Sequence, residues 1–155
     1  MQQRETRIHI DAAPEEVYAM VADVTRMGEW SPECYRCQWI EGATGPAVGA
    51  RFRGYSKSRF LRWSRTVVVT AADPGREFAF TTLTDFINAD STNWRYRFEP
   101  ENGGTAVTES YEVTKTPRLI IRVISAIAGR PHDMVPHMNQ TLARLKAVAE
   151  GMAKE

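Results

Sequence analysis

Cysteine is scarce in this sequence: its 155 residues include only Cys34 and Cys37. Two cysteines cannot build the several bridges of a disulfide-stabilised scaffold. The opening residues, MQQRETRIHI, also lack the apolar stretch of a secretory signal. We therefore expect a reducing, cytoplasmic setting for the protein.

A long hydrophobic run is missing as well. The most apolar segment, residues 119–128, is interrupted by Arg122 and Ser125 and falls far short of the ~20 residues that a membrane helix needs. Charge of one sign is not in excess, because 20 Lys and Arg face 19 Asp and Glu. The surplus of cations typical of nucleic-acid binders is thus absent. We expect neither a transmembrane segment nor a nucleic-acid partner.

Linkers, low-complexity tracts and internal repeats are not found anywhere along the chain. Hydrophobic residues make up 43% and charged residues 25%, which is an ordinary globular composition. A chain of this length can bury a core without disulfides or metals. Residues 1–155 are therefore expected to form a single domain.

The hydrophobic pattern changes twice along the sequence. A strand over residues 4–10 precedes a helix that opens at Pro14, with acidic residues in its first turn. Alternation then predicts strands at 34–41, 50–57, 62–72, 77–84, 91–99 and 105–114. Helical periodicity returns at 119–128 and over a final helix from about 132 to 153. Short turns make neighbouring strands antiparallel, so we expect an α+β fold with about seven strands covered by the C-terminal helix.

One face of the predicted sheet is unusually aromatic. In the strand around residue 96, Trp94, Tyr96 and Phe98 share a face, and two charged residues, Arg65 and Glu109, fall on the same side. These aromatics are either plain core or the wall of a cavity, and the two charges favour a cavity. Arg65 and Glu109 either pair with each other or one strand is out of phase by one residue. The candidate ligand-binding residues are Phe52, Trp63, Arg65, Phe78, Phe80, Trp94, Tyr96, Phe98, Glu109, Tyr111, Met134 and Met138.

Catalytic and metal-binding residues are harder to assign. Glu109 and His137 are candidate acid/base groups, although Glu109 serves equally well as a hydrogen-bond anchor. Cys34 and Cys37 form a lone CxxC motif without the second pair of ligands that structural zinc needs. Residues three apart in a strand point to opposite faces, so we expect two ordinary thiols. No metal and no cofactor are predicted.

Several segments resemble one family. They are IHIDAAPEEVY from Ile8, WSPEC from Trp30, VGARF from Val48, ADPGR from Ala72, WRYRFEP from Trp94 and LARLK from Leu142. Together they are similar to the START/Bet v 1-like (SRPBCC) superfamily, in particular to bacterial polyketide cyclase/dehydrase-like or lipid-transport-like members. The resemblance spans nearly the whole chain. It implies a helix-grip fold, in which a curved antiparallel sheet surrounds a long C-terminal helix and encloses an apolar cavity.

Three functional hypotheses follow. The first is binding of a hydrophobic, cyclic, lipid or polyketide-like small molecule between the sheet and the C-terminal helix. The alternative is a polyketide cyclase, aromatase or dehydratase that uses a cavity acid/base. A third hypothesis makes the apolar residues 119–128 a docking segment, either a gate or a contact for a membrane or a second copy of the chain.

Overall fold

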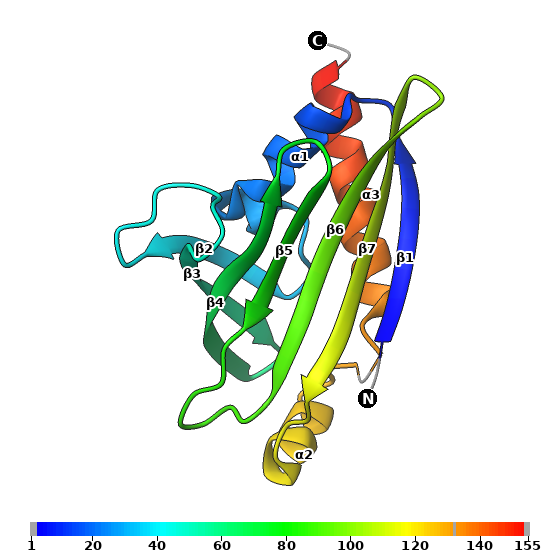
Figure 1. The fold of residues 1–155 in the computed structure, drawn as a ribbon. Helices are drawn as coiled ribbons and strands as arrows, with labels where there is room; N and C mark the ends of the chain where they lie inside the picture. The colour runs from blue at the N-terminus through cyan, green and yellow to red at the C-terminus, as the bar shows by residue number, and fades with distance from the viewer. Residues whose placement is uncertain (1–2, 132, 154–155) are drawn as a thin grey trace.

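The computed structural model describes residues 3–131 and 133–153 (Figure 1). Within these ranges the predicted order of strands and helices is confirmed. Seven strands are present: β1 (Gln3–Ile10), β2 (Cys34–Ile40), β3 (Arg51–Ser58), β4 (Leu61–Asp73), β5 (Glu77–Thr82), β6 (Ser91–Glu101) and β7 (Gly104–Lys115). The helices are α1 (Pro14–Ala22), the 3-10 helix η1 (Val24–Glu29), α2 (Leu119–Ile127) and α3 (Val135–Ala153). The predicted start of the last helix, His132, lies outside the described residues, and α3 begins at Val135.

The seven strands form one antiparallel sheet in the order β1-β7-β6-β5-β4-β3-β2. Strands β2 to β7 follow each other along the chain, and β1 returns to pair with β7. The turn between β6 and β7 shows how tightly the sequence controls this order. Asn102 (φ 48°) and Gly103 (φ 79°) both take left-handed backbone conformations, which a two-residue hairpin of the favoured type requires.

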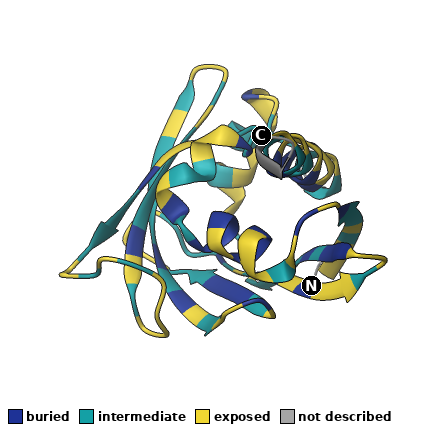
Figure 2. Ribbon diagram, turned by 90° about the horizontal axis from the view of Figure 1, so that it is seen from above, coloured by how far each residue is buried: buried dark blue, intermediate teal, exposed yellow. Residues whose placement is uncertain are grey.

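Two helices cover the concave face of the sheet (Figure 2). Pro14 occupies the first turn of α1, and Val17 and Val21 lie one helical turn apart on its buried side. Helix α1 contacts β5, β6 and β7, whereas α3 lies mainly against β1 and β7. The expectation that the terminal helix alone covers the sheet is therefore wrong, because α1 covers the middle strands.

Helix α2 lies apart from this core, at the end of the molecule where β7 finishes (Figure 1). None of its residues is buried. The hairpin between β3 and β4 touches its C-terminal end, where the Ser58 hydroxyl donates to the carbonyl oxygen of Ala128 at 3.0 Å. No helix in the two described ranges is both long and apolar enough to cross a membrane.

Candidate functional site

A buried carboxyl group lies at the centre of the concave face. Glu109 of β7 is directly opposite Tyr96 of β6, and both side chains point to the interior because they share a register position. The Tyr96 hydroxyl donates a hydrogen bond to Glu109 Oε2 at 2.9 Å. Glu109 is 3% exposed, and its second oxygen, Oε1, has no hydrogen-bond partner among the described residues. Such an unpaired buried oxygen is costly for a fold and is typical of a functional group.

The surroundings of this carboxyl change its chemistry. Removal from water raises the pKa of Glu109 to about 8, although the hydrogen bond from Tyr96 opposes the rise. Burial and the nearby Glu109 raise the pKa of the Tyr96 hydroxyl well above its ordinary value. At neutral pH Glu109 is therefore mostly protonated. A neutral carboxylic acid can donate a hydrogen bond from Oε1 while it accepts one at Oε2.

His137 lies on α3 and is the second candidate acid/base group. Its Nδ1 atom is buried and has no hydrogen-bond partner in the described part of the chain. The next turn of the helix is tied to the same residue, because the Thr141 hydroxyl donates to the His137 carbonyl oxygen at 2.9 Å. Glu109 on the sheet and His137 on α3 thus each have a buried polar atom without a partner in the described residues.

Arg65 does not pair with Glu109, so the first of the two alternatives is wrong. Its guanidinium instead contacts both carboxylate oxygens of Asp90, at 3.1 and 3.0 Å. It also donates to the carbonyl oxygens of Leu83 and Asp90. These contacts join β4 to the segment between β5 and β6, so Arg65 supports that loop while its Nε remains unpaired. Asp90 was not predicted because it lies in an irregular stretch without periodicity.

Part of the predicted aromatic wall packs tightly against other rings. Tyr18 of α1 stands edge-on to Phe78 and Phe98, with ring centroids 6.3 and 5.8 Å apart. Phe52 and Phe80 are similarly edge-on at 5.5 Å. These contacts stabilise the fold beneath α1. The four phenylalanines therefore already have aromatic neighbours in the core.

The remaining predicted residues differ in burial. Trp63 and Trp94 are only partly buried, and so is Met134, whereas Met138 is fully buried. The Tyr111 hydroxyl donates to Asp133 at 3.3 Å and accepts from the backbone N–H of Met134, also at 3.3 Å. Tyr111 thereby holds the start of α3 against the sheet.

Arg130 lies over the ring of Trp63. Its guanidinium lies 5.0 Å from the centroid of the Trp63 ring and makes two hydrogen bonds to the Glu33 carboxylate, at 2.8 and 3.1 Å. These contacts attach the α2–α3 connection to β2 and β4. The sequence offered no signal for this contact, because the three residues are far apart along the chain.

The two cysteines lie on the same face of β2, contrary to the sequence-based expectation. A bulge between Cys34 and Arg36 shifts the pairing, so Cys34 is opposite Ser56 and Cys37 is opposite Gly54. The bulge changes the alternation of side chains by one residue. The Sγ atoms of Cys34 and Cys37 are consequently 3.4 Å apart.

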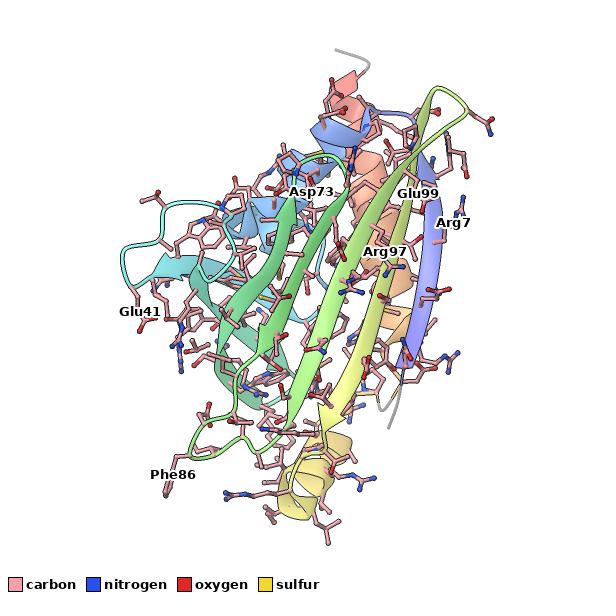
Figure 3. All side chains as sticks on the ribbon, viewed as in Figure 1. Arg7, Glu41, Asp73, Phe86, Arg97 and Glu99 are labelled. Carbon is pink, nitrogen blue, oxygen red and sulfur yellow. The ribbon has the colours of Figure 1, made fainter. Side chains whose placement is uncertain are left out.

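Two surface depressions lie elsewhere. One, of about 560 Å³, is lined by the loop between β2 and β3, and the other, of about 400 Å³, lies on the outer face over β1, β6 and β7. The outer one is lined by alternating charged side chains, among them Arg7, Arg97 and Glu99 (Figure 3). Neither contains a predicted ligand-binding residue. Neither lies between the sheet and α3, where the ligand cavity was expected.

The architecture defines a class of protein. A curved antiparallel sheet gripping a C-terminal helix is the Bet v 1-like, or SRPBCC, fold. The structure of Ara h 8.0201 is similar, with a TM-score of 0.65 at 12% identity over 97% of this chain and 98% of that one. The predicted helix-grip fold is therefore confirmed.

The family follows from the sequence. Residues 1–150 match the family described as "Polyketide cyclase / dehydrase and lipid transport", and the chain belongs to that family. A polyketide cyclase-like protein from Corynebacterium glutamicum is 34% identical over 96% of this chain and 91% of its own, with a TM-score of 0.60. The di-domain ARO/CYC StfQ from the steffimycin biosynthetic pathway has a TM-score of 0.75 at 17% identity, over 99% of this chain and 52% of its own. No curated protein matches significantly.

Proposed function

We propose that residues 1–155 form a single domain that binds a hydrophobic, ring-containing small molecule between the sheet and α3. The single observation that carries this proposal is the unpaired Oε1 of Glu109, in an interior where nearly all other polar atoms are paired. A neutral carboxylic acid offers a hydrogen bond to a carbonyl or hydroxyl oxygen. The ligand is therefore an uncharged molecule with such an acceptor, flanked by Trp63, Trp94 and Met134.

A matched pair of probes tests this function. Anthrone and anthracene have the same three-ring frame, but only anthrone carries a carbonyl oxygen. We expect anthrone to bind about tenfold more tightly, which is the value of one well-placed hydrogen bond. Binding is followed by tryptophan fluorescence and by native mass spectrometry.

Variants then assign the hydrogen bond. Glu109→Gln keeps a hydrogen-bond donor and should retain the preference for anthrone. Glu109→Leu should lose this preference without weakening the binding of anthracene. Trp94→Ala should weaken the binding of both probes. The control Tyr35→Ala removes an exposed ring on β2 and should change the binding of neither. If neither probe binds the wild-type protein, or if binding is indifferent to Trp94→Ala, the proposal is refuted.

We infer a second candidate function, an acid/base-catalysed cyclisation, aromatisation or dehydration of a poly-β-ketone. The observation that favours it is the pKa of Glu109, about 8, because proton transfer is most efficient when the pKa of the group lies near the working pH. His137 supplies a second proton-carrying group. Glu109→Gln and His137→Ala separate the two functions: loss of turnover with binding retained supports the enzyme, and absence of turnover in the wild type supports the carrier.

We also propose that the α2 end of the molecule contacts a membrane while the ligand enters. Its exposed apolar side chains are Phe60, Phe86, Ile87, Leu119, Ile120, Val123 and Ile127. Phe86 is 94% exposed and projects from the loop between β5 and β6, at the same end as α2 (Figure 3). Exposed cations, among them Arg59, Arg118 and Arg122, belong to the same segments and favour an anionic lipid surface.

Flotation with phosphatidylcholine vesicles, with and without about a third phosphatidylglycerol, tests this contact. We expect binding to the anionic vesicles and its loss in the variant Ile120→Ser, while Val48→Ser, an exposed apolar residue at 70% in another loop, has no effect. A concentration-dependent mass without vesicle binding would show instead that α2 contacts a second copy of the chain. We infer a cytoplasmic location from the composition, which cell fractionation tests.

A further inference from the structure

Three sulfur atoms meet at the start of β2. Cys34 Sγ and Cys37 Sγ are 3.4 Å apart, and Cys37 Sγ is 3.7 Å from the thioether sulfur of Met27 in η1. We call Met27, Cys34 and Cys37 the sulfur cluster. Gly54 on the neighbouring strand lies directly against it, since a Cβ there would make ordinary contacts of 3.5 Å with Cys37 Sγ and 3.7 Å with Cys34 Sγ. Neither ligand binding nor catalysis as proposed above uses this cluster.

The spacing of the two sulfurs suits a bridging atom better than a direct bond. A disulfide would bring the two Sγ atoms from 3.4 Å to about 2.05 Å, a larger shift than a bridging metal ion requires. An atom bound between the two sulfurs requires less movement of the strand than a direct bond between them.

The two thiols also differ in accessibility, since Cys34 is the more exposed of the two. A thiophilic cation can therefore meet the sulfur of Cys34 first and then displace the thiol proton of each cysteine as it binds.

We propose that the sulfur cluster binds one copper(I) ion through the two thiolates of Cys34 and Cys37 and the thioether of Met27. Two thiol protons leave to solvent as the two metal–thiolate bonds form, and the thioether adds a third bond. Three sulfurs around one ion at about 2.3 Å each lie about 4 Å from one another, so the spacings of 3.4 and 3.7 Å widen by about 0.6 and 0.3 Å.

The donor set selects the metal. Thiolate and thioether sulfur are soft ligands that favour copper(I), whereas magnesium and calcium require oxygen. Zinc in structural sites takes four ligands from Cys, His and acidic residues. Over residues 3–131 and 133–153 no group of three His, Cys, Asp or Glu is assembled for a metal. The third ligand at this site is a thioether, and this separates copper(I) from zinc.

Anaerobic titration of the full chain with copper(I), in competition with the chromogenic chelator bicinchoninate, tests the proposal. The wild type should retain one copper per chain. Cys34→Ser and Cys37→Ser should each weaken binding by about a hundredfold or more, and Met27→Leu by about tenfold. Met20→Leu, a buried methionine on α1, is the matched control and should bind like the wild type. X-ray absorption of the copper-bound protein should show three sulfur neighbours.

Each other outcome overturns the proposal. Complete removal of copper by the chelator means that the site does not form, and retention by Cys37→Ser means that copper binds elsewhere. Tighter binding of zinc than of copper(I) would contradict the role of the thioether. Rapid oxidation of the two thiols to a disulfide in preference to metal binding, seen as a loss of two mass units, would also refute it. Thermal unfolding of each metal-free variant checks that the fold is kept.

Discussion

Replacement of Glu109 by glutamine should stabilise the protein at neutral pH, and the gain should grow with pH. The folded protein holds the carboxyl with a pKa of about 8, against an ordinary value of 4.5. Between these two values the folded state binds one proton more than the unfolded state. The free energy of unfolding therefore falls as pH rises, by up to about 1.4 kcal/mol per pH unit.

The expected magnitude follows from that slope. Between pH 4.5 and 7, the wild type loses about 3 kcal/mol through Glu109 alone, and the loss levels off above pH 8. Glutamine has almost the same shape and no titratable proton, and its amide oxygen can still accept the hydrogen bond of Tyr96. The difference in unfolding free energy between Glu109→Gln and the wild type should therefore rise by about 3 kcal/mol from pH 4.5 to 7.

Urea unfolding at half-unit pH intervals from 4.5 to 8.5 measures this difference, and the titrations of all other groups cancel. Glu112→Gln is the matched control, because Glu112 lies on the same strand but its side chain is exposed. Its difference from the wild type should not follow the same curve. A Glu109→Gln difference that is constant with pH, or that falls, would refute the protonated, desolvated state of this carboxyl.

Three further substitutions test other contacts. Tyr96→Phe removes the hydrogen bond that lowers the pKa of Glu109, so this pKa, measured by carbon-13 NMR of the carboxyl, should rise further. Asp90→Ala should cost about 2 kcal/mol in urea unfolding, less than a fully buried ion pair, because Arg65 keeps its contacts with carbonyl oxygens. Gly104→Ala should lower the thermal midpoint strongly, because its Cβ would lie 2.4 Å from a carbonyl oxygen of β1.

Each of these three substitutions has a matched control. Tyr55→Phe removes a hydroxyl from the outer part of the sheet and should leave the Glu109 titration unchanged. Asp73→Ala removes an exposed carboxylate and should cost less than Asp90→Ala. Gly45→Ala adds a Cβ with nothing within 4 Å and should be neutral. Equal effects of control and test in any pair would contradict the contact assigned to it.

Strand alternation was sufficient to predict which face of the sheet is buried. It placed Tyr96 and Glu109 on the concave side correctly, because β6 and β7 pair there without a register shift. It failed for Cys34 and Cys37, because the bulge in β2 depends on pairing with β3 and leaves no mark in the alternation. Sequence patterns of period two describe regular strands and miss the places where a residue is inserted.

Contacts between residues far apart in the sequence could not be predicted either. The partner of Arg65 was misassigned because Asp90 lies in a loop, and a loop carries no periodicity from which its position can be inferred. The edge-on packing of Tyr18 against Phe78 and Phe98 depends on where α1 crosses the sheet, which helical spacing alone does not determine. The family resemblance supplied the overall grip arrangement but none of these pairings.

The pairing of β1 with β7 has a consequence for synthesis of the chain. Strand β1 finds its hydrogen-bonding partner only after residues 104–115 have left the ribosome, and α3, which also contacts β1, follows later still. Until then β1 has an unsatisfied backbone edge, which can pair with other nascent chains. Premature termination between β1 and β7 should thus yield fragments prone to aggregation.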